Sequence, residues 1–171
     1  IDVPGEWSMQ GFEVDANDFA VYEKDFSVPR SWNNYTVKLR CEAVYSLSEI
    51  FINGQKVGSH FGGFTPFEFD LTEFVQFGKS NNIRLLVKND SLGDYLAAGS
   101  KYANHPLGGI TRDIYLFVVP KVNISSFGFT TDFDDNYQDA TLNVTLEIAN
   151  QSASDAKDVG LEFELKDLNG Q

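Results

Sequence analysis

The dipeptide Asn53-Gly54 is the strongest constraint on the fold, because it lies between two short segments that are typical of strands. Ile50-Phe51-Ile52 comes before it and Gln55-Lys56-Val57 follows it. Asn and Gly both accept the positive φ angles that a two-residue hairpin turn requires. The sequence therefore predicts that the chain reverses here as two antiparallel strands.

Strict alternation of apolar and polar residues predicts further strands. One apolar row consists of Tyr35, Val37, Leu39, Cys41 and Ala43. Its period of two is that of a half-buried antiparallel strand, and the same period occurs at residues 67–71 and 83–87. No long segment has a helical period, and the chain holds 15 Phe and 7 Tyr, which suit a pleated surface. These patterns predict an all-β chain folded as a jelly-roll β-sandwich.

The pattern changes after residue 113. Residues 114–119 are apolar on both faces, which indicates a strand covered on both sides, and Pro120 ends it. Alternation returns at 140–148 and 159–165, as expected for early strands of an immunoglobulin-like sandwich. We therefore expect a jelly-roll domain at 1–119 and a truncated immunoglobulin-like domain at 120–171. The turn at Asn169-Gly170 leaves the expected last strand without its partner, which indicates a fragment of a longer protein.

Composition excludes some partners. The net charge of −12 would repel nucleic acid and anionic membranes, whereas neutral carbohydrates remain compatible. No run is long enough for a membrane span or a signal-peptide core. The chain starts at Ile1 without an initiator Met, so a secretory signal could have been removed, and we slightly favour export over a cytoplasmic location. Cys41 is the single cysteine and is expected to be a small buried side chain.

Metal ligands are not expected. The two histidines, His60 and His105, are not spaced from another soft ligand as a zinc site requires. Residues 132–136 resemble the opening of a calcium loop, but Tyr137 stands where the sharp turn needs Gly, and Asn143 where a bidentate Glu should be. An acidic solvated loop is the simpler interpretation. The sequence therefore predicts no metal and no other cofactor.

Four motifs occur in a fixed order along the chain. They are Phe26-Ser27-Val28-Pro29 with Trp32, the hairpin at 51–58, the Gly62-Gly63-Phe64-Thr65-Pro66-Phe67 turn that runs on to Leu71, and Gly108-Gly109-Ile110-Thr111-Arg112-Asp113 with the strand after it. Their order and spacing resemble the sugar-binding jelly roll of glycoside hydrolase family 2, which includes β-galactosidases and β-glucuronidases. The segment after Pro120 resembles the immunoglobulin-like domain that follows it in that family.

The resemblance implies a non-catalytic role. In that family two catalytic glutamates lie on a barrel after these two domains, and retaining hydrolysis needs two carboxyls about 5 Å apart. Nothing in the spacing of the 25 acidic residues here selects such a pair. The resemblance implies the N-terminal region of a β-galactosidase-like enzyme, which supports the active site, helps to bind carbohydrate and belongs to a full-length enzyme that could be a homo-oligomer. A stand-alone carbohydrate-binding module and an adhesive β-sandwich without a sugar ligand are the alternatives.

The resemblance also suggests substrate contacts. A polar residue at the end of the 83–87 strand contacts galactose in β-galactosidase-like members, which makes Asp90 the best candidate and Asn89 its neighbour. The alternative is that the same residues form an ordinary turn, in which short polar side chains bond the main chain. In the following loop, Tyr102 and His105 could stack on or bond a sugar, or they could pack against the barrel.

Overall fold

The computed structural model describes residues 1–15, 18–89 and 107–168. The chain divides into two compact units, Ile1–Pro120 and Lys121–Gln171. In the described residues every ladder between strands is antiparallel, and the helical structure consists of two 3-10 turns, η1 (Ser8–Gln10) and η2 (Arg30–Trp32). The all-β prediction is therefore confirmed. None of the described helices is long and apolar enough to cross a membrane.

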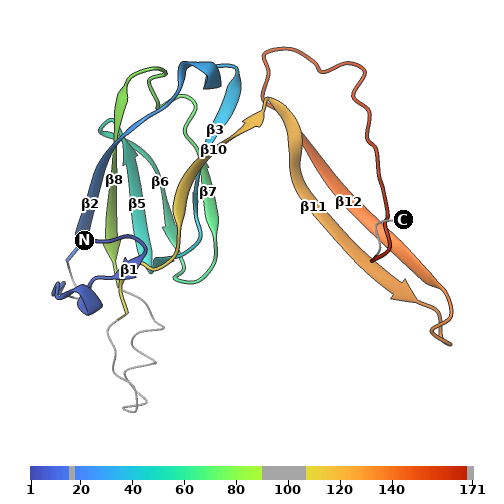
Figure 1. The fold of residues 1–171 in the computed structure, drawn as a ribbon, viewed down its shortest axis with the longest axis horizontal. Coiled ribbons are helices and arrows are strands. Elements are labelled where there is room, and N and C mark those ends of the chain that lie inside the picture. The colour runs from blue at the N-terminus through green and yellow to red at the C-terminus, as the bar shows by residue number, and fades with distance from the viewer. Residues whose placement is uncertain (16–17, 90–106, 169–171) are drawn as a thin grey trace. The chain divides into compact units, whose positions relative to one another are not determined.

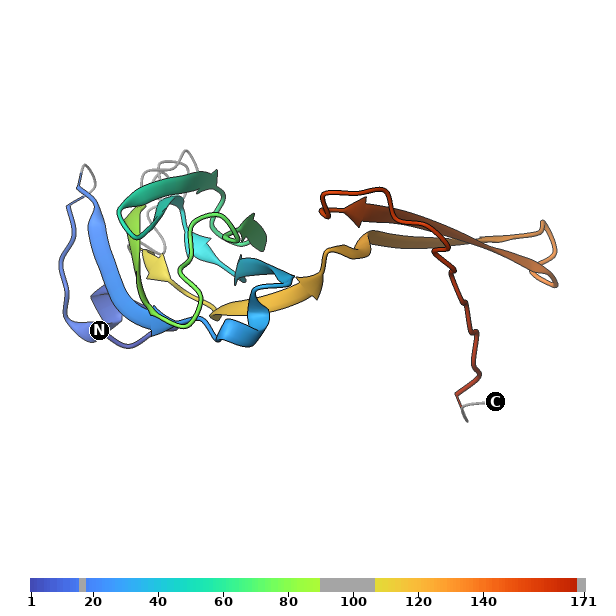
Figure 2. The same ribbon diagram turned by 90° about the horizontal axis from the view of Figure 1, so that it is seen from above.

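The first unit is a sandwich of two main sheets (Figure 1). The four-stranded sheet has the order β2 (Ala20–Ser27), β8 (Ser80–Lys88), β5 (Leu47–Ile52) and β6 (Gln55–Phe61). The three-stranded sheet has the order β10 (Ile114–Pro120), β3 (Tyr35–Cys41) and β7 (Phe67–Asp70). A short third sheet has the order β1 (Gly5–Glu6), β9 (Gly109–Ile110) and β4 (Val44–Tyr45). Figure 2 views this unit from above, with the strands arranged around a common interior.

The core lies between the two main sheets and contains the predicted apolar rows. Val37, Leu39 and Cys41 of β3 are buried, as alternation predicts. They pack in one cluster with apolar residues of β8 and β5. Tyr35, at the first position of β3, is 40% exposed, so the predicted row is covered only from its second member onwards.

The predicted hairpin is confirmed. Asn53 and Gly54 join β5 to β6 with φ angles of 50° and 80°. The Asn53 side chain donates hydrogen bonds to the Phe74 carbonyl and to Asn81 Oδ1, both at 2.9 Å, and its own oxygen accepts from the Asn82 N–H at 3.0 Å. The turn is therefore tied to the beginning of β8 as well as to its own strands.

The second unit contains one long hairpin, β11 (Val122–Phe133) and β12 (Ala140–Asn150), with a bulge between Ile124 and Ser126. Asp134 caps its turn by accepting from the N–H groups of Gln138 and Asp139. The strand predicted at 140–148 is therefore present. The immunoglobulin-like assignment of this unit stays a prediction.

The strand predicted at 159–165 is wrong for this structure. The segment has no strand pairing, and Val159, Leu161, Phe163 and Leu165 are all exposed. A strand persists only when a neighbour satisfies its main-chain N–H and C=O groups. The alternation of apolar and polar residues indicates which face a neighbouring sheet would bury. Among the described residues this segment has no such neighbour.

Candidate functional site

One end of the first unit gathers the chain segments that flank the predicted sugar contacts. We call it the loop-bearing end and define it by Ser46, Gly62, Lys88, Asn89 and Gly108. The Ser46 N–H donates to the Lys88 carbonyl at 3.0 Å, and the Gly62 N–H donates to the Ser46 carbonyl at 2.8 Å. These bonds fix the ends of β6 and β8 to the start of β5, so the position where Asn89 leaves the sheet is set by main-chain geometry.

Of the predicted contact residues, only Asn89 is described. Asp90, Tyr102 and His105 lie outside the described residues, so their role stays a prediction. Asn89 is half-buried, and its Oδ1 is buried without a hydrogen-bond partner in the described part of the chain. A buried acceptor without a donor costs about 1–3 kcal/mol. Asn89 therefore offers an acceptor that a donor from outside the described residues can satisfy.

Two more buried polar atoms lack partners close to this end, counting described residues only. They are Ser48 Oγ in β5 and His60 Nε2 in β6. Ser48 lies opposite both His60 and Val87 in the strand register, so the atoms belong to adjacent strands. Ser48 was missed by the sequence analysis, although Ser48, Ile50 and Ile52 form one buried row in which a hydroxyl stands where an apolar group is expected.

His60 is held neutral by its surroundings. Its ring stacks on Phe67 with 4.0 Å between centroids. Burial lowers the pKa of His60, and a weaker interaction with the main chain of Gly62 works in the opposite direction. A neutral imidazole has one nitrogen that donates a hydrogen bond and one that accepts. Either nitrogen can pair with an uncharged hydroxyl group.

The lowered pKa of His60 makes stability fall in mild acid. The unfolded chain binds a proton near pH 6.5 and the folded chain only at lower pH, so stability is lost as the pH falls from 7.5 to 5.5. Urea unfolding at pH 7.5, 6.5 and 5.5 should show this loss in the wild type and a smaller one in His60→Phe, which keeps the ring stack. If the free energy of unfolding falls equally with pH in the two proteins, the assignment to His60 is contradicted.

The Gly-Gly-aromatic turn presents an aromatic pair at the same end. Phe64 is 65% exposed and contacts the Tyr45 ring edge-on, with centroids 5.3 Å apart. A Cβ on Gly63 would overlap that Tyr45 ring, which explains glycine at this position. Phe61, at the end of β6, is 64% exposed. Exposed rings of this kind can stack on a sugar face.

The carboxylates on the outer face of the three-stranded sheet are not suited to proton transfer. Arg40 bonds Glu42 at 2.6 Å and Glu68 at 2.8 Å, while Lys38 bonds Glu68 at 3.2 Å. The bond from Arg40, with one from Tyr115, lowers the pKa of Glu42. Both acids are therefore held ionised, whereas a glycosidase needs one protonated carboxyl. No group of described His, Cys, Asp and Glu side chains is placed to hold a metal ion.

Residues 9–120 match the family model described as the sugar binding domain of glycosyl hydrolases family 2. The chain belongs to glycosyl hydrolase family 2. The matched region covers the two main sheets of the first unit and the loop-bearing end. The resemblance identified from the four sequence motifs is thus confirmed.

Individual family 2 relatives support the same placement. The chain is 29% identical to a β-galactosidase of Priestia megaterium over 100% of its own length and 18% of the relative's. It is 31% identical to a β-galactosidase of Thermoanaerobacter pseudethanolicus over 85% of this chain and 20% of the relative. Among solved structures, a β-glucuronidase from an uncultured Clostridium sp. has 26% identity and a TM-score of 0.68, over 85% of this chain and 27% of that one. The chain spans about a fifth of the length of these curated relatives.

Proposed function

We propose that this chain is the N-terminal, non-catalytic region of a β-galactosidase-like family 2 glycoside hydrolase. In this role it supports the active site and contributes to carbohydrate binding. The observation that carries the proposal is the match of residues 9–120 to the family's sugar binding domain, in a chain that spans 18% of its β-galactosidase relative. The ionised, ion-paired carboxylates of the outer face support a non-catalytic role.

The loop-bearing end is the region that we propose for the carbohydrate contact. The buried acceptor of Asn89 and the neutral imidazole of His60 suit the hydroxyl groups of a sugar. Asp90, Tyr102 and His105 complete the proposed set. The net charge of −12 favours a neutral galactoside over an anionic glucuronide, because a carboxylate on the sugar would be repelled.

Activity measurements test the division of labour between this chain and the rest of the enzyme. The chain of residues 1–171 should give no release above the blank from chromogenic β-galactosides or β-glucuronides. The full-length polypeptide should hydrolyse the galactoside. Turnover by residues 1–171 alone, or failure of the full-length polypeptide on both substrates, would refute the proposal.

Replacing Asn89 by alanine in the full-length enzyme should raise KM for a galactoside about 10-fold. The reason is the loss of one hydrogen-bond acceptor, worth roughly 1.4 kcal/mol. Steady-state kinetics should show a smaller change in kcat, because the residue lies outside the reacting carboxyls. Asn34→Ala, an exposed position in the turn before β3, is the matched control and should leave both constants unchanged. An unchanged KM in Asn89→Ala would remove Asn89 from the proposed contact.

A stand-alone carbohydrate-binding module is the second candidate, and the exposed rings of Phe61 and Phe64 favour it. Under the main proposal these rings contribute little without the rest of the enzyme. Calorimetric titration of residues 1–171 with a galacto-oligosaccharide should then show no binding with a Kd below about 1 mM. That Kd corresponds to a binding free energy of roughly −4 kcal/mol. Binding tighter than this that is lost in Phe64→Ala would establish the module instead.

A further inference from the structure

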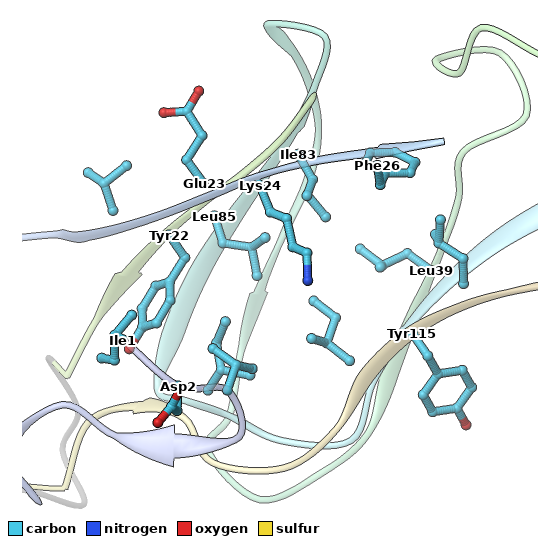
Figure 3. A pocket seen from close by; sticks show the side chains of 15 residues that line it. Ile1, Asp2, Tyr22, Glu23, Lys24, Phe26, Leu39, Ile83, Leu85 and Tyr115 are labelled. Atoms are coloured by element: carbon cyan, nitrogen blue, oxygen red, sulfur yellow. The ribbon is translucent and has the colours of Figure 1, made fainter. Parts of the chain in front are cut away.

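A groove opens between the two main sheets on the side of β2 and β10 (Figure 3). Its volume is about 820 Å³. β2 contributes Tyr22, Lys24 and Phe26 to its lining, and β10 contributes Ile114 and Leu116. The first residues of the chain, Ile1, Asp2 and Val3, also line it. A hollow of this size between two packed layers is unusual, because sandwich interiors are filled at crystal-like density.

The number of strands explains the hollow. The sheet that contains β2 has four strands, and the sheet that faces it has three and stops at β10 in the described residues. The inward side chains of β2 therefore face the groove where a fourth opposing strand would lie. A strand added to β10 would run about 4.8 Å from it, which is the spacing of neighbours in a sheet.

The hydrogen-bond pattern of β3 shows which of its main-chain groups face β10. The Val37 N–H donates to Thr72 Oγ1, and the Val37 carbonyl accepts from the Leu71 N–H. The main-chain N–H and C=O groups of the odd-numbered residues of β3 are therefore directed toward the β7 side. Bonding direction alternates along an antiparallel strand. The main-chain groups of the even-numbered residues are therefore directed toward β10. The bond from the Glu42 N–H to the Asp113 carbonyl agrees with this.

The outer edge of β10 follows from this register. Tyr115 lies opposite Arg40 and Phe117 opposite Lys38, so these residues of β10 bond to β3. Ile114, Leu116 and Val118 lie between them and direct their N–H and C=O groups away from β3, toward the groove side. Such an edge is a template for a further strand.

Lys24 gives the groove its one described cationic side chain. It alternates with Tyr22 and Phe26 on β2, and Figure 3 shows its ammonium directed between the sheets. The side chain is exposed at present. A strand in the groove would cover it, and a covered ammonium requires a carboxylate or carbonyl oxygen as partner.

We propose that this groove takes a β-strand from the part of the same polypeptide that lies outside residues 1–171. The strand pairs with the outer edge of β10, inserts alternate apolar side chains between the sheets and presents an acceptor oxygen to Lys24. The proposal rests on the proposed function only in that the chain is part of a longer polypeptide. Two observations favour this occupant over a second copy.

The first observation is length, because the chain spans 18% of its β-galactosidase relative, which leaves ample polypeptide to supply a strand. The second is position, because Ile1, Asp2 and Val3 line the groove. A segment joined there would start at the groove mouth, and such a tether gives a local concentration in the millimolar range without a second molecule.

Amide hydrogen exchange tests the pairing. In residues 1–171 the N–H groups of Ile114, Leu116 and Val118 should exchange quickly, and in the full-length polypeptide roughly 100-fold or more slowly. The Glu68 N–H, at the outer edge of β7, serves as internal reference and should change little. Fast exchange in the full-length polypeptide would overturn the proposal. Slow exchange in residues 1–171 that depends on protein concentration would also overturn it, in favour of a second copy.

A charge reversal tests the proposed partner of Lys24. Lys24→Glu should lower the Tm of the full-length polypeptide by several degrees and leave that of residues 1–171 nearly unchanged. Lys79→Glu makes the same charge change at an exposed turn and should affect neither protein. Equal shifts in both proteins would overturn the inference. These readouts do not use glycoside hydrolysis, so failure of the proposed function and failure of this pairing remain distinguishable.

Discussion

Replacing Asn81 by alanine should lower the free energy of unfolding of the first unit by about 3 kcal/mol. Asn81 is 2% exposed. Its Oδ1 accepts from the Gln76 N–H and from Asn53 Nδ2, and its Nδ2 donates to the carbonyls of Gln76 and Lys79. Alanine would take away the partner of the Gln76 N–H and of the Lys79 carbonyl, and it would remove one of the bonds that tie the Asn53-Gly54 hairpin to the start of β8.

Thermal unfolding followed by circular dichroism measures this effect. A loss of about 3 kcal/mol corresponds to a Tm lower by roughly 10 °C for a unit of this size. Asn34→Ala, at an exposed turn, is the control and should shift Tm by no more than about 2 °C. A shift in Asn81→Ala as small as in the control would show that water replaces the lost bonds.

Replacing Gly108 by valine should cost about 3 kcal/mol or more, because the new side chain has no space. A Cβ at this position would overlap the six-membered ring of Trp7, which is 2% exposed. The Trp7 N–H also donates to the Gly108 carbonyl at 3.1 Å, so ring and main chain cannot both stay in place. We expect displacement of Trp7 and loosening of the return from the loop-bearing end into β9.

The second unit offers a matched control for this substitution. Gly128 in β11 has no atom within 4 Å of an added Cβ, and valine suits a strand. Gly128→Val should therefore be neutral or slightly stabilising. Urea unfolding can be followed by the fluorescence of Trp7 and Trp32. It should show a large loss of stability in Gly108→Val and none in Gly128→Val. Equal stability of both would contradict the steric argument.

Local rules were sufficient where a residue's neighbours in sequence determine its structure. Asn53-Gly54 adopts the expected turn because positive φ is a property of those two residues. Val37, Leu39 and Cys41 are buried because a period of two on a strand fixes which side chains share a face. The same reasoning predicted the strand over residues 140–148 of β12.

Features that depend on distant partners were not predictable in this way. Thr36 belongs to the predicted polar face of its strand, yet it is 2% exposed, and alternation cannot say how well the second face is covered. Lys24 was not singled out, because its importance comes from β10 lying across the sandwich. The strand expected at 159–165 needed a neighbour that sequence periodicity does not supply.

The burial of Cys41 gives the protein an intrinsic probe of separation between its layers. Burial raises the pKa of this thiol to about 12, and the side chain is 1% exposed. Since the thiolate is the reactive form, alkylating reagents can reach and modify it only in molecules whose sheets have come apart. The chain has one cysteine, so the modification rate follows a single event. Comparing this rate in residues 1–171 and in a longer polypeptide that carries the proposed strand would measure how far that strand reduces separation of the two sheets.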